Sequence, residues 1–236
     1  MKNFPITCYD DFYENPDQVR EFALSLEYTK VSGFFPGSRT QPLSTIDNDF
    51  CEFSCQRVLS IFGDYSETCD PNNYRALTQF QKTSRFSSDS DDPVNMGWIH
   101  EDIKADLAAV IYLDPNPNID SGTTMYTLTN NNFGKDEISE QMKKVRYDVF
   151  MSTTTCDIDS GKHYEKSLID NNNHFEKTLE IKNCYNRAIM YNGNQFHAQS
   201  SIYNKFDFRL TQIFFVDDLH TPVNNIPRWR CSNYAL

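Results

Sequence analysis

Apolar residues recur with two different periods along this chain, and the first period is helical. Between residues 15 and 26 the apolar side chains fall at the i, i+3, i+4 and i+7 positions of one helix face, namely Val19, Phe22, Ala23 and Leu26. Asn15 followed by Pro16 is a typical helix start, with the asparagine as N-cap. A second helix is predicted from about residue 48 to 62, with Gly63 as its stop.

The second period is that of β-strands. Residues 74–83 alternate between apolar and polar positions, and residues 107–113 form a continuous apolar run that ends in the turn sequence Asp114–Pro117. A further apolar run covers residues 188–191, and residues 209–216 alternate again. The remainder of the chain is therefore expected to form a β framework on which the N-terminal helices pack.

Polar stretches between these runs predict loops. Residues 84–92 contain consecutive serines and aspartates, which favours a solvated loop, although a mobile flap that covers a site is the alternative. Residues 32–39 are also predicted as a loop, whose aromatic side chains either anchor it or line a binding site. Residues 127–182, rich in Asn and Lys with short helical pieces such as 137–145, are interpreted as an insertion between two β segments.

Composition limits the possible partners. A net charge of -11 and a pI near 4.8 argue against a surface that binds nucleic acid. No run of eighteen apolar residues is present and the N-terminus lacks an apolar signal core, so we expect a soluble, cytoplasmic protein without a membrane span. The cysteines are odd in number and lack a C-x-x-C pair, which fits reduced thiols: Cys8, Cys51, Cys55, Cys69, Cys156, Cys184 and Cys231.

The most informative motif is His100-x-Asp102, which precedes the apolar run at 107–113. On an extended segment, side chains two residues apart leave the same face and can bind one cation. A second histidine, His197, follows the apolar run 188–191. Two imidazoles and one carboxylate form the facial triad typical of non-haem iron(II) sites, which leaves coordination positions open for chemistry.

The other histidines fit this pattern less well. His174-Phe175-Glu176 also has the His-x-carboxylate spacing, but no apolar strand surrounds it, so a solvated loop is the better interpretation. His163 and His220 have no carboxylate at metal-ligand spacing and are interpreted as surface residues.

Arg209 and Thr211 share one face of the strand predicted at 209–216, and this face is otherwise apolar. A buried guanidinium requires a partner, because an unpaired buried charge costs several kcal/mol. That partner is either the carboxylate of a bound ligand, held by the two-pronged arginine head, or an aspartate in a structural ion pair.

Several of these features occur together in one known family, in the same order along the chain: His100-x-Asp102, Ala109–Asp114, Ser121–Thr124, His197 and Arg209-x-Thr211. In this the chain resembles the iron(II)/2-oxoglutarate-dependent dioxygenases, and most of all their prolyl 4-hydroxylase-like branch. The resemblance implies a mainly β (α+β) fold with a double-stranded β-helix, a cupin-like jelly roll, as its core. One domain is then expected over residues 1–236, with helical support at 1–73, the core at 74–216 including the 127–182 insertion, and a tail at 217–236.

The resemblance also implies the chemistry. His100, Asp102 and His197 would bind Fe(II), and Arg209 would pair with the distal carboxylate of 2-oxoglutarate, with hydrogen bonds from Tyr112 and Thr211. The reaction would consume O2 and 2-oxoglutarate, release succinate and CO2, and hydroxylate a C–H bond of a peptide or small-molecule substrate. Two alternatives are a cupin-like metal enzyme without 2-oxoglutarate, in which Arg209 is a structural ion pair, and a metal-free jelly-roll binding module.

Overall fold

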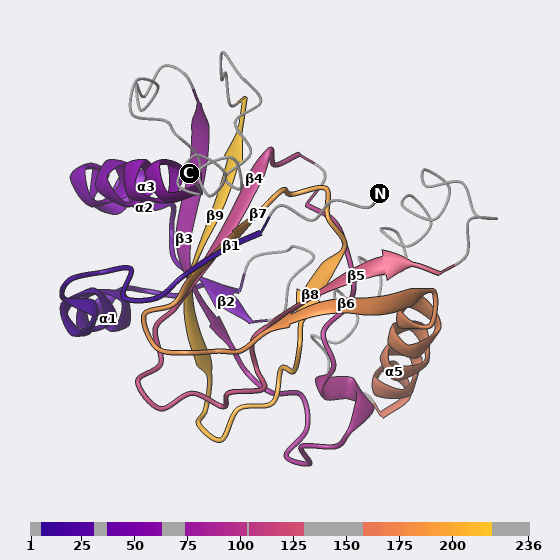
Figure 1. Ribbon diagram of the computed structural model, residues 1–236. Coiled ribbons are helices and arrows are strands. Elements are labelled where there is room, and N and C mark those ends of the chain that lie inside the picture. The colour runs from indigo at the N-terminus through magenta and orange to yellow at the C-terminus, as the bar shows by residue number, and fades with distance from the viewer. Residues whose placement is uncertain (1–5, 31–36, 63–73, 103, 130–157, 219–236) are drawn as a thin grey trace.

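Two antiparallel sheets and a group of N-terminal helices make up the fold in the computed structural model, which describes residues 6–30, 37–62, 74–102, 104–129 and 158–218 (Figure 1). The N-terminal elements are β1 (Ile6–Tyr9), α1 (Pro16–Ser25), β2 (Ser38–Arg39), α2 (Leu43–Ile46) and α3 (Asn48–Phe62). They are followed by β3 (Arg75–Thr83), the short 3-10 helix η2 (Pro93–Asn95), β4 (Leu107–Tyr112) and β5 (Thr123–Leu128). The last elements are α5 (Ile158–Asn172), β6 (Phe175–Ile181), β7 (Ala188–Tyr191), β8 (His197–Gln199) and β9 (Arg209–Asp217).

The larger sheet has six strands in the order β1-β7-β4-β9-β3-β2, and every pairing in it is antiparallel. Its longest pairing joins β3 to β9, which run side by side from Arg75 opposite Asp217 to Thr83 opposite Arg209. The smaller sheet has the order β6-β5-β8, also antiparallel. In Figure 1 the helices α1, α2 and α3 lie on one side of the larger sheet and the smaller sheet lies on the other.

Alternation along the central strands divides their side chains between two cores. On β9, Leu210, Phe214 and Val216 join the core beneath the helices, while Phe215 packs between the two sheets. On β4, the same rule sends Leu107, Ala109 and Ile111 toward the helices and Ala108 and Tyr112 toward the smaller sheet. A one-residue shift of register would exchange these sets, so burial on both faces fixes the pairing of the central strands.

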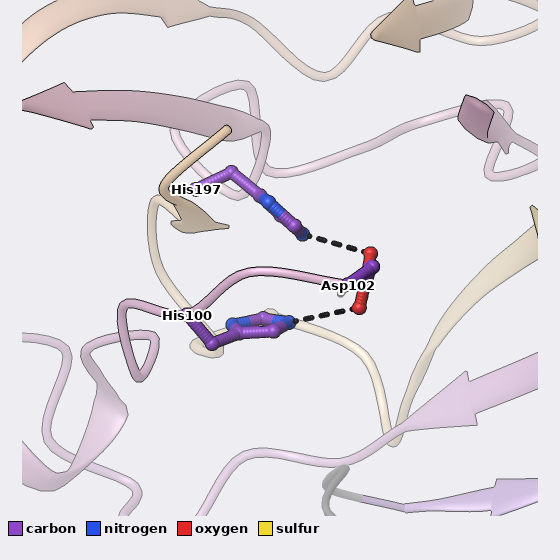
Figure 2. A group of neighbouring side chains, drawn as sticks. All are labelled: His100, Asp102 and His197. Atoms are coloured by element: carbon purple, nitrogen blue, oxygen red, sulfur yellow. Dashed lines mark ion pairs between the residues drawn. The ribbon is translucent and has the colours of Figure 1, made fainter. Parts of the chain in front are cut away.

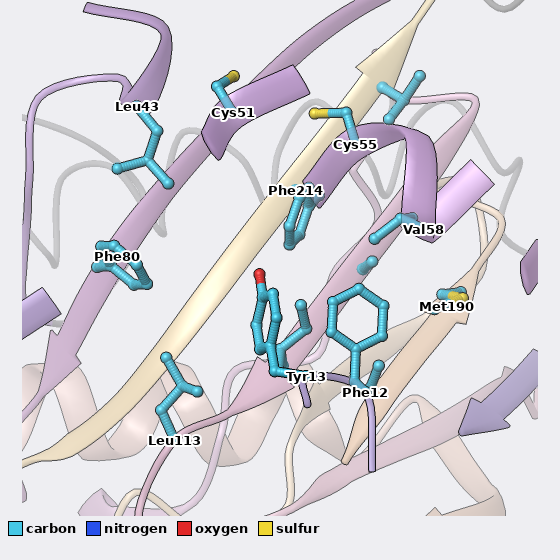
Figure 3. Packing of buried hydrophobic residues seen from close by; sticks show 14 of the residues in the cluster. Phe12, Tyr13, Leu43, Cys51, Cys55, Val58, Phe80, Leu113, Met190 and Phe214 are labelled. Atoms are coloured by element: carbon cyan, nitrogen blue, oxygen red, sulfur yellow. The ribbon is translucent and has the colours of Figure 1, made fainter. Parts of the chain in front are cut away.

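The core under the helices holds the N-terminal part on the sheet (Figure 3). The predicted stripe of the first helix contributes to it, with Ala23 buried and Val19, Phe22 and Leu26 packed against it. The second predicted helix contributes Cys55, Val58 and Leu59, but Phe53 is 52% exposed, outside the packed face. Gln212 is the polar exception in this layer, because its fully buried amide accepts a 2.5 Å hydrogen bond from the Tyr13 hydroxyl and donates to Thr78 Oγ1.

The strands and helices match the predicted periods, with four local differences. The first helix begins at Pro16 as predicted, but the Asn15 side chain makes no capping hydrogen bond. Residues 38–39, predicted as loop, pair with β3 as strand β2. Thr123 and Thr124, where no strand was predicted, begin β5. The prediction of a loop at His174-Phe175-Glu176 was wrong, because Phe175 and Glu176 begin β6 and pair with Leu128 and Thr127.

The strand β6 also lies inside the stretch interpreted as an insertion, so part of that stretch belongs to the smaller sheet. Gly63, the helical piece at 137–145 and His220 lie outside the described residues. The loop at 84–92 is tied down by the buried Asn95, whose amide accepts from the backbone of Phe86 and Ser87 and donates to the carbonyls of Ser87 and Asp89. Among the described residues, Cys8, Cys51, Cys55 and Cys184 are free thiols.

None of the described helices combines the length and the apolar character that crossing a bilayer requires.

The buried Tyr13–Gln212 contact gives a first test of the fold. We expect Tyr13→Phe to lower the free energy of unfolding by about 1–3 kcal/mol, because the buried amide oxygen of Gln212 loses its donor. Tyr9→Phe is the matched control, since Tyr9 is exposed, and should change stability by less than about 0.5 kcal/mol. Urea denaturation of both variants measures the difference; equal stabilities would contradict the assigned contact.

Candidate active site

A short antiparallel pairing brings the predicted metal ligands together. The His100 N–H donates to the His197 carbonyl and the His197 N–H donates to the His100 carbonyl, both at 2.9 Å. The Asp102 N–H donates to the Gly193 carbonyl at 2.7 Å. The segment 97–102 therefore runs along the edge of β8 that does not pair with β5, and along the turn before β8. Gly193 permits this approach, because a Cβ at that position would lie 2.2 Å from the Ala105 carbonyl oxygen.

Three side chains converge on one point at this pairing, as Figure 2 shows. Asp102 lies between the two imidazoles, with Oδ2 at 3.2 Å from His197 Nε2 and Oδ1 at 3.7 Å from His100 Nε2. One ligand atom from each residue lies within 4.8 Å of those of the other two. The segment therefore brings together His100, Asp102 and His197 in an arrangement that could hold a metal ion.

The hydrogen bonds of the two imidazoles determine which ring nitrogens face Asp102. His100 Nδ1 lies 2.8 Å from the Trp98 carbonyl oxygen and His197 Nδ1 lies 2.8 Å from the Gln195 carbonyl oxygen. A carbonyl only accepts, so each Nδ1 carries the proton, and in a neutral ring each Nε2 then presents a lone pair. Two lone pairs and a carboxylate that face one another repel unless a cation or a proton lies between them. The same Nδ1–H to carbonyl bond orients histidine ligands in metal sites.

Arg209 lies in the layer between the sheets and is 6% exposed. Its Nη1 donates to the Ser121 carbonyl at 2.5 Å, but neither Arg209 Nε nor the buried Thr211 hydroxyl has a hydrogen-bond partner in the described part of the chain. No carboxylate among the described residues forms an ion pair with the guanidinium, and burial lowers the Arg209 pKa from its usual value. An anion that reached this point would satisfy both orphaned donors.

Tyr112 adjoins the same group, because Thr211 lies directly opposite it in the pairing of β4 with β9. Its ring is 5.7 Å from the Arg209 guanidinium carbon, and its hydroxyl shares a 2.8 Å hydrogen bond with Thr123 Oγ1. Burial raises the Tyr112 pKa to about 12, so the phenol is protonated and can donate a hydrogen bond. The structure thus places Arg209, Tyr112 and Thr211 next to one another.

Tyr191 is a site residue that the sequence pattern did not reveal. The apolar run 188–191 identifies it only as a strand residue, yet its ring lies 4.6 Å from the His197 ring, centroid to centroid. Burial raises the Tyr191 pKa well above its usual value, and the negative charge of Asp102 raises it further. The positive charge of Arg209 acts on the same phenol in the opposite direction, so Tyr191 lies within electrostatic range of both groups of site residues. The strand register places Tyr191 on the face of β7 that points toward the site, and the sequence gives no indication of this register.

The rival metal pair is not supported by the geometry. Among the described residues, His100, Asp102 and His197 form a group of three potential ligands, and neither His174 nor Glu176 belongs to such a group. The His163 side chain and all of His220 lie outside the described residues.

Sequence comparison assigns a family without an activity. The profile of the family described as "Family of unknown function (DUF6445)" matches residues 1–209. No curated protein matches the chain in sequence.

Structural comparison finds similar folds in HygX from Streptomyces hygroscopicus. HygX with nickel and 2-oxoglutarate bound aligns with a TM-score of 0.52 at 12% identity, over 91% of this chain and 83% of HygX. HygX with nickel, 2-oxoglutarate and hygromycin B bound aligns at 0.53 and 10% identity with the same coverage. HygX with iron bound aligns at 0.50 and 9% identity, over 91% of this chain and 82% of HygX. At such identities the similarity is one of fold.

The buried Asp114 gives a pH-dependent test of this region. Burial raises its pKa from 3.8 to about 6, and the opposing effects come from the Leu210 N–H, which donates to Oδ2 at 3.1 Å, and from the charge of Arg209. Because the folded-state pKa is the higher one, the folded protein binds more protons between these values, and Asp114 lowers stability as the pH rises from about 4 to 6. We expect Asp114→Asn to remove this loss.

The measurement is the difference in unfolding free energy between Asp114→Asn and the wild type at several pH values. The difference should grow in favour of the variant from pH 4 to pH 6 by about 3 kcal/mol, then level off. In this difference, the pH-dependent contributions of the carboxylates that both proteins contain cancel. A difference that stays constant across this pH range would show that Asp114 titrates normally.

Proposed function

The chain belongs to DUF6445, a family of unknown function, and from its site we propose that it is an iron(II)- and 2-oxoglutarate-dependent oxygenase. The observation that carries the proposal is the presence of two complementary groups in one protein core. One is a three-residue cation site of two imidazoles and a carboxylate. The other is a buried guanidinium with an orphaned donor and no ion-pair partner in the described residues.

His100, Asp102 and His197 would hold the metal. Their Nε2 lone pairs and carboxylate oxygens suit a divalent first-row metal, and three protein ligands leave positions free for small molecules. The ion would supply the means to activate O2 at those positions. HygX, which shares the fold, binds iron or nickel in its structures, and this supports the choice of metal.

Arg209, Thr211 and Tyr112 would bind the distal carboxylate of 2-oxoglutarate. The guanidinium offers charge and a directed donor, and the Thr211 hydroxyl next to it is a second unused donor. The Tyr112 phenol, protonated because it is buried, is within reach of the same group. HygX also binds 2-oxoglutarate, which supports the assignment of this co-substrate.

The surrounding residues would keep the reaction away from water. His197, Tyr112, Thr211 and Arg209 are all buried between the two sheets. Tyr191 contacts the His197 ring and belongs to the apolar cluster that contains Met125 and Ile189. A dry site strengthens the charge interactions that orient the co-substrate and protects a reactive oxidant from side reactions.

The substrate is proposed as a small molecule or a peptide whose C–H bond is hydroxylated, with succinate and CO2 as co-products. HygX binds the small molecule hygromycin B in one of its structures, which favours a small molecule. The two antiparallel sheets, with the site between them, are compatible with the double-stranded β-helix of this superfamily. Membership of its prolyl 4-hydroxylase-like branch stays a prediction from the sequence motifs.

A cupin-like enzyme without 2-oxoglutarate is the second candidate. It uses the same triad, but it requires Arg209 as a structural ion pair, and the described residues provide no such pair. A metal-free binding module would need a proton in place of the metal at the His–Asp contacts, and it would give no role to the unused donor of Arg209. The geometry therefore favours the oxygenase over both alternatives.

Metal binding is tested with His100→Ala. We expect it to weaken Mn(II) binding, measured anaerobically by calorimetry, by more than about 100-fold, since even the loss of a residue that only orients a ligand costs about 10–100-fold. His174→Ala is the control, because His174 belongs to the rival His-x-carboxylate pair, and it should bind Mn(II) like the wild type. Loss of binding in the control instead of in His100→Ala would move the metal site to the rival pair.

Co-substrate binding is tested with Arg209→Ala and succinate formation as the assay. We expect the KM for 2-oxoglutarate to rise by about 10- to 100-fold, the equivalent of a hydrogen bond to a charged group, while Mn(II) affinity stays unchanged. Arg75→Ala, which removes an exposed arginine, should leave both values as in the wild type. If the wild type binds metal but forms no succinate with any of the amino acids and peptides offered or with hygromycin B, the cupin-like alternative takes precedence.

A further inference from the structure

Two asparagines of α5 bind the segment that carries two of the three candidate metal ligands. The inner side of segment 97–102 pairs with β8 through the reciprocal His100–His197 hydrogen bonds. In an antiparallel pair the next residue points its N–H and C=O away from the partner strand. Those outward groups belong to Ile99, which is buried, so they need partners from another element.

No strand of the described chain pairs with this outer side, and side-chain amides supply the hydrogen bonds instead. The Ile99 N–H donates to Asn172 Oδ1 at 3.1 Å, and Asn172 Nδ2 donates to the Gly97 carbonyl at 2.9 Å. Bonding the carbonyl of residue 97 and the N–H of residue 99 is the pattern that one residue of a parallel strand would make. Asn171 Nδ2 adds a bond to the Ile99 carbonyl at 3.2 Å and a second one to Asn172 Oδ1.

Packing holds α5 in the position that these bonds require. Trp98, between the two bonded residues, packs with Tyr164 and Leu168 of α5 in a separate buried cluster. Tyr164, Leu168 and the asparagine pair lie at the i, i+4, i+7 and i+8 positions of one helix face. The same face of α5 therefore contributes both the apolar contact and the hydrogen bonds to this segment.

We propose that Asn172, assisted by Asn171, is a positioning residue for the metal centre. The Asn172 side-chain amide makes the hydrogen bonds that a neighbouring strand would otherwise make, and these bonds fix the backbone that carries His100 and Asp102. The inference rests on the proposed function, since it concerns that metal. Without the amide, the buried Ile99 N–H and Gly97 carbonyl lose their partners, and the segment can shift relative to β8. Misplacement of ligands by a fraction of an ångström is enough to weaken a coordination site.

The experiment compares the Mn(II) affinity of Asn172→Ala, Asn171→Ala and Asn173→Ala, measured by calorimetry well below the unfolding temperature of each. Asn173 is the matched control, because it is the adjacent asparagine and its side chain is exposed. We expect a 10- to 100-fold loss of affinity for Asn172→Ala, a smaller loss for Asn171→Ala and no change for Asn173→Ala. At saturating metal, the KM for 2-oxoglutarate should stay within about twofold of the wild type in all three, because Arg209 lies on another strand.

If Asn172 has only a structural role, Asn172→Ala will lower the unfolding temperature but leave the Mn(II) affinity of the folded protein unchanged. That outcome overturns the proposal. Asn172→Ser, which is too short to span both bonds, replaces Asn172→Ala if the latter does not fold. Hydrogen exchange of the wild type without metal gives an independent test, because the Ile99 amide should be protected, and free exchange there would also overturn the proposal. If the wild type binds no Mn(II), the proposed function fails as well, whereas normal metal binding in a folded Asn172 variant refutes the positioning role alone.

Discussion

The pair of backbone hydrogen bonds between His100 and His197 is the contact on which the site depends. It joins two segments almost a hundred residues apart and sets the two imidazoles side by side, with ring centroids 4.4 Å apart. Asp102 follows on the same segment, and Gly193 and Gly97 allow the chain to approach the turn before β8 and the strand itself. The backbone hydrogen bonds of His100, His197 and Asp102 thus position the three side chains that converge.

The two faces of the larger sheet have different roles. One face of it binds the N-terminal helices through a large apolar core, and the other faces the smaller sheet and carries the polar groups of the site. The alternation of each strand sends side chains to both, so Leu210 and Arg209, adjacent in sequence, serve different layers. Groups that would be costly in a single core are tolerated here because the helix-side core supplies the stabilisation.

Burial also determines how the charged groups of the site behave. It lowers the pKa of Arg209, raises that of Tyr112 and raises that of Asp114, which is held near the arginine without an ion pair. A buried cation with unused donors is costly in the free protein, and a carboxylate ligand would relieve that cost. The burial that makes the Arg209 charge costly would therefore favour the binding of an anion beside it.

The sequence by itself determined the two N-terminal helices and the central strands, because periodic patterns are local properties. Its short motifs also singled out His100, Asp102 and His197, which the structure brings close together. It did not determine that Phe175 begins a strand or that Ser38 and Arg39 pair with β3, since both strands depend on a partner distant in the chain. Only the tertiary structure placed Tyr191 against His197 and the amides of Asn171 and Asn172 beside Ile99. Contacts between residues far apart in sequence follow from register and packing, and no local pattern specifies these.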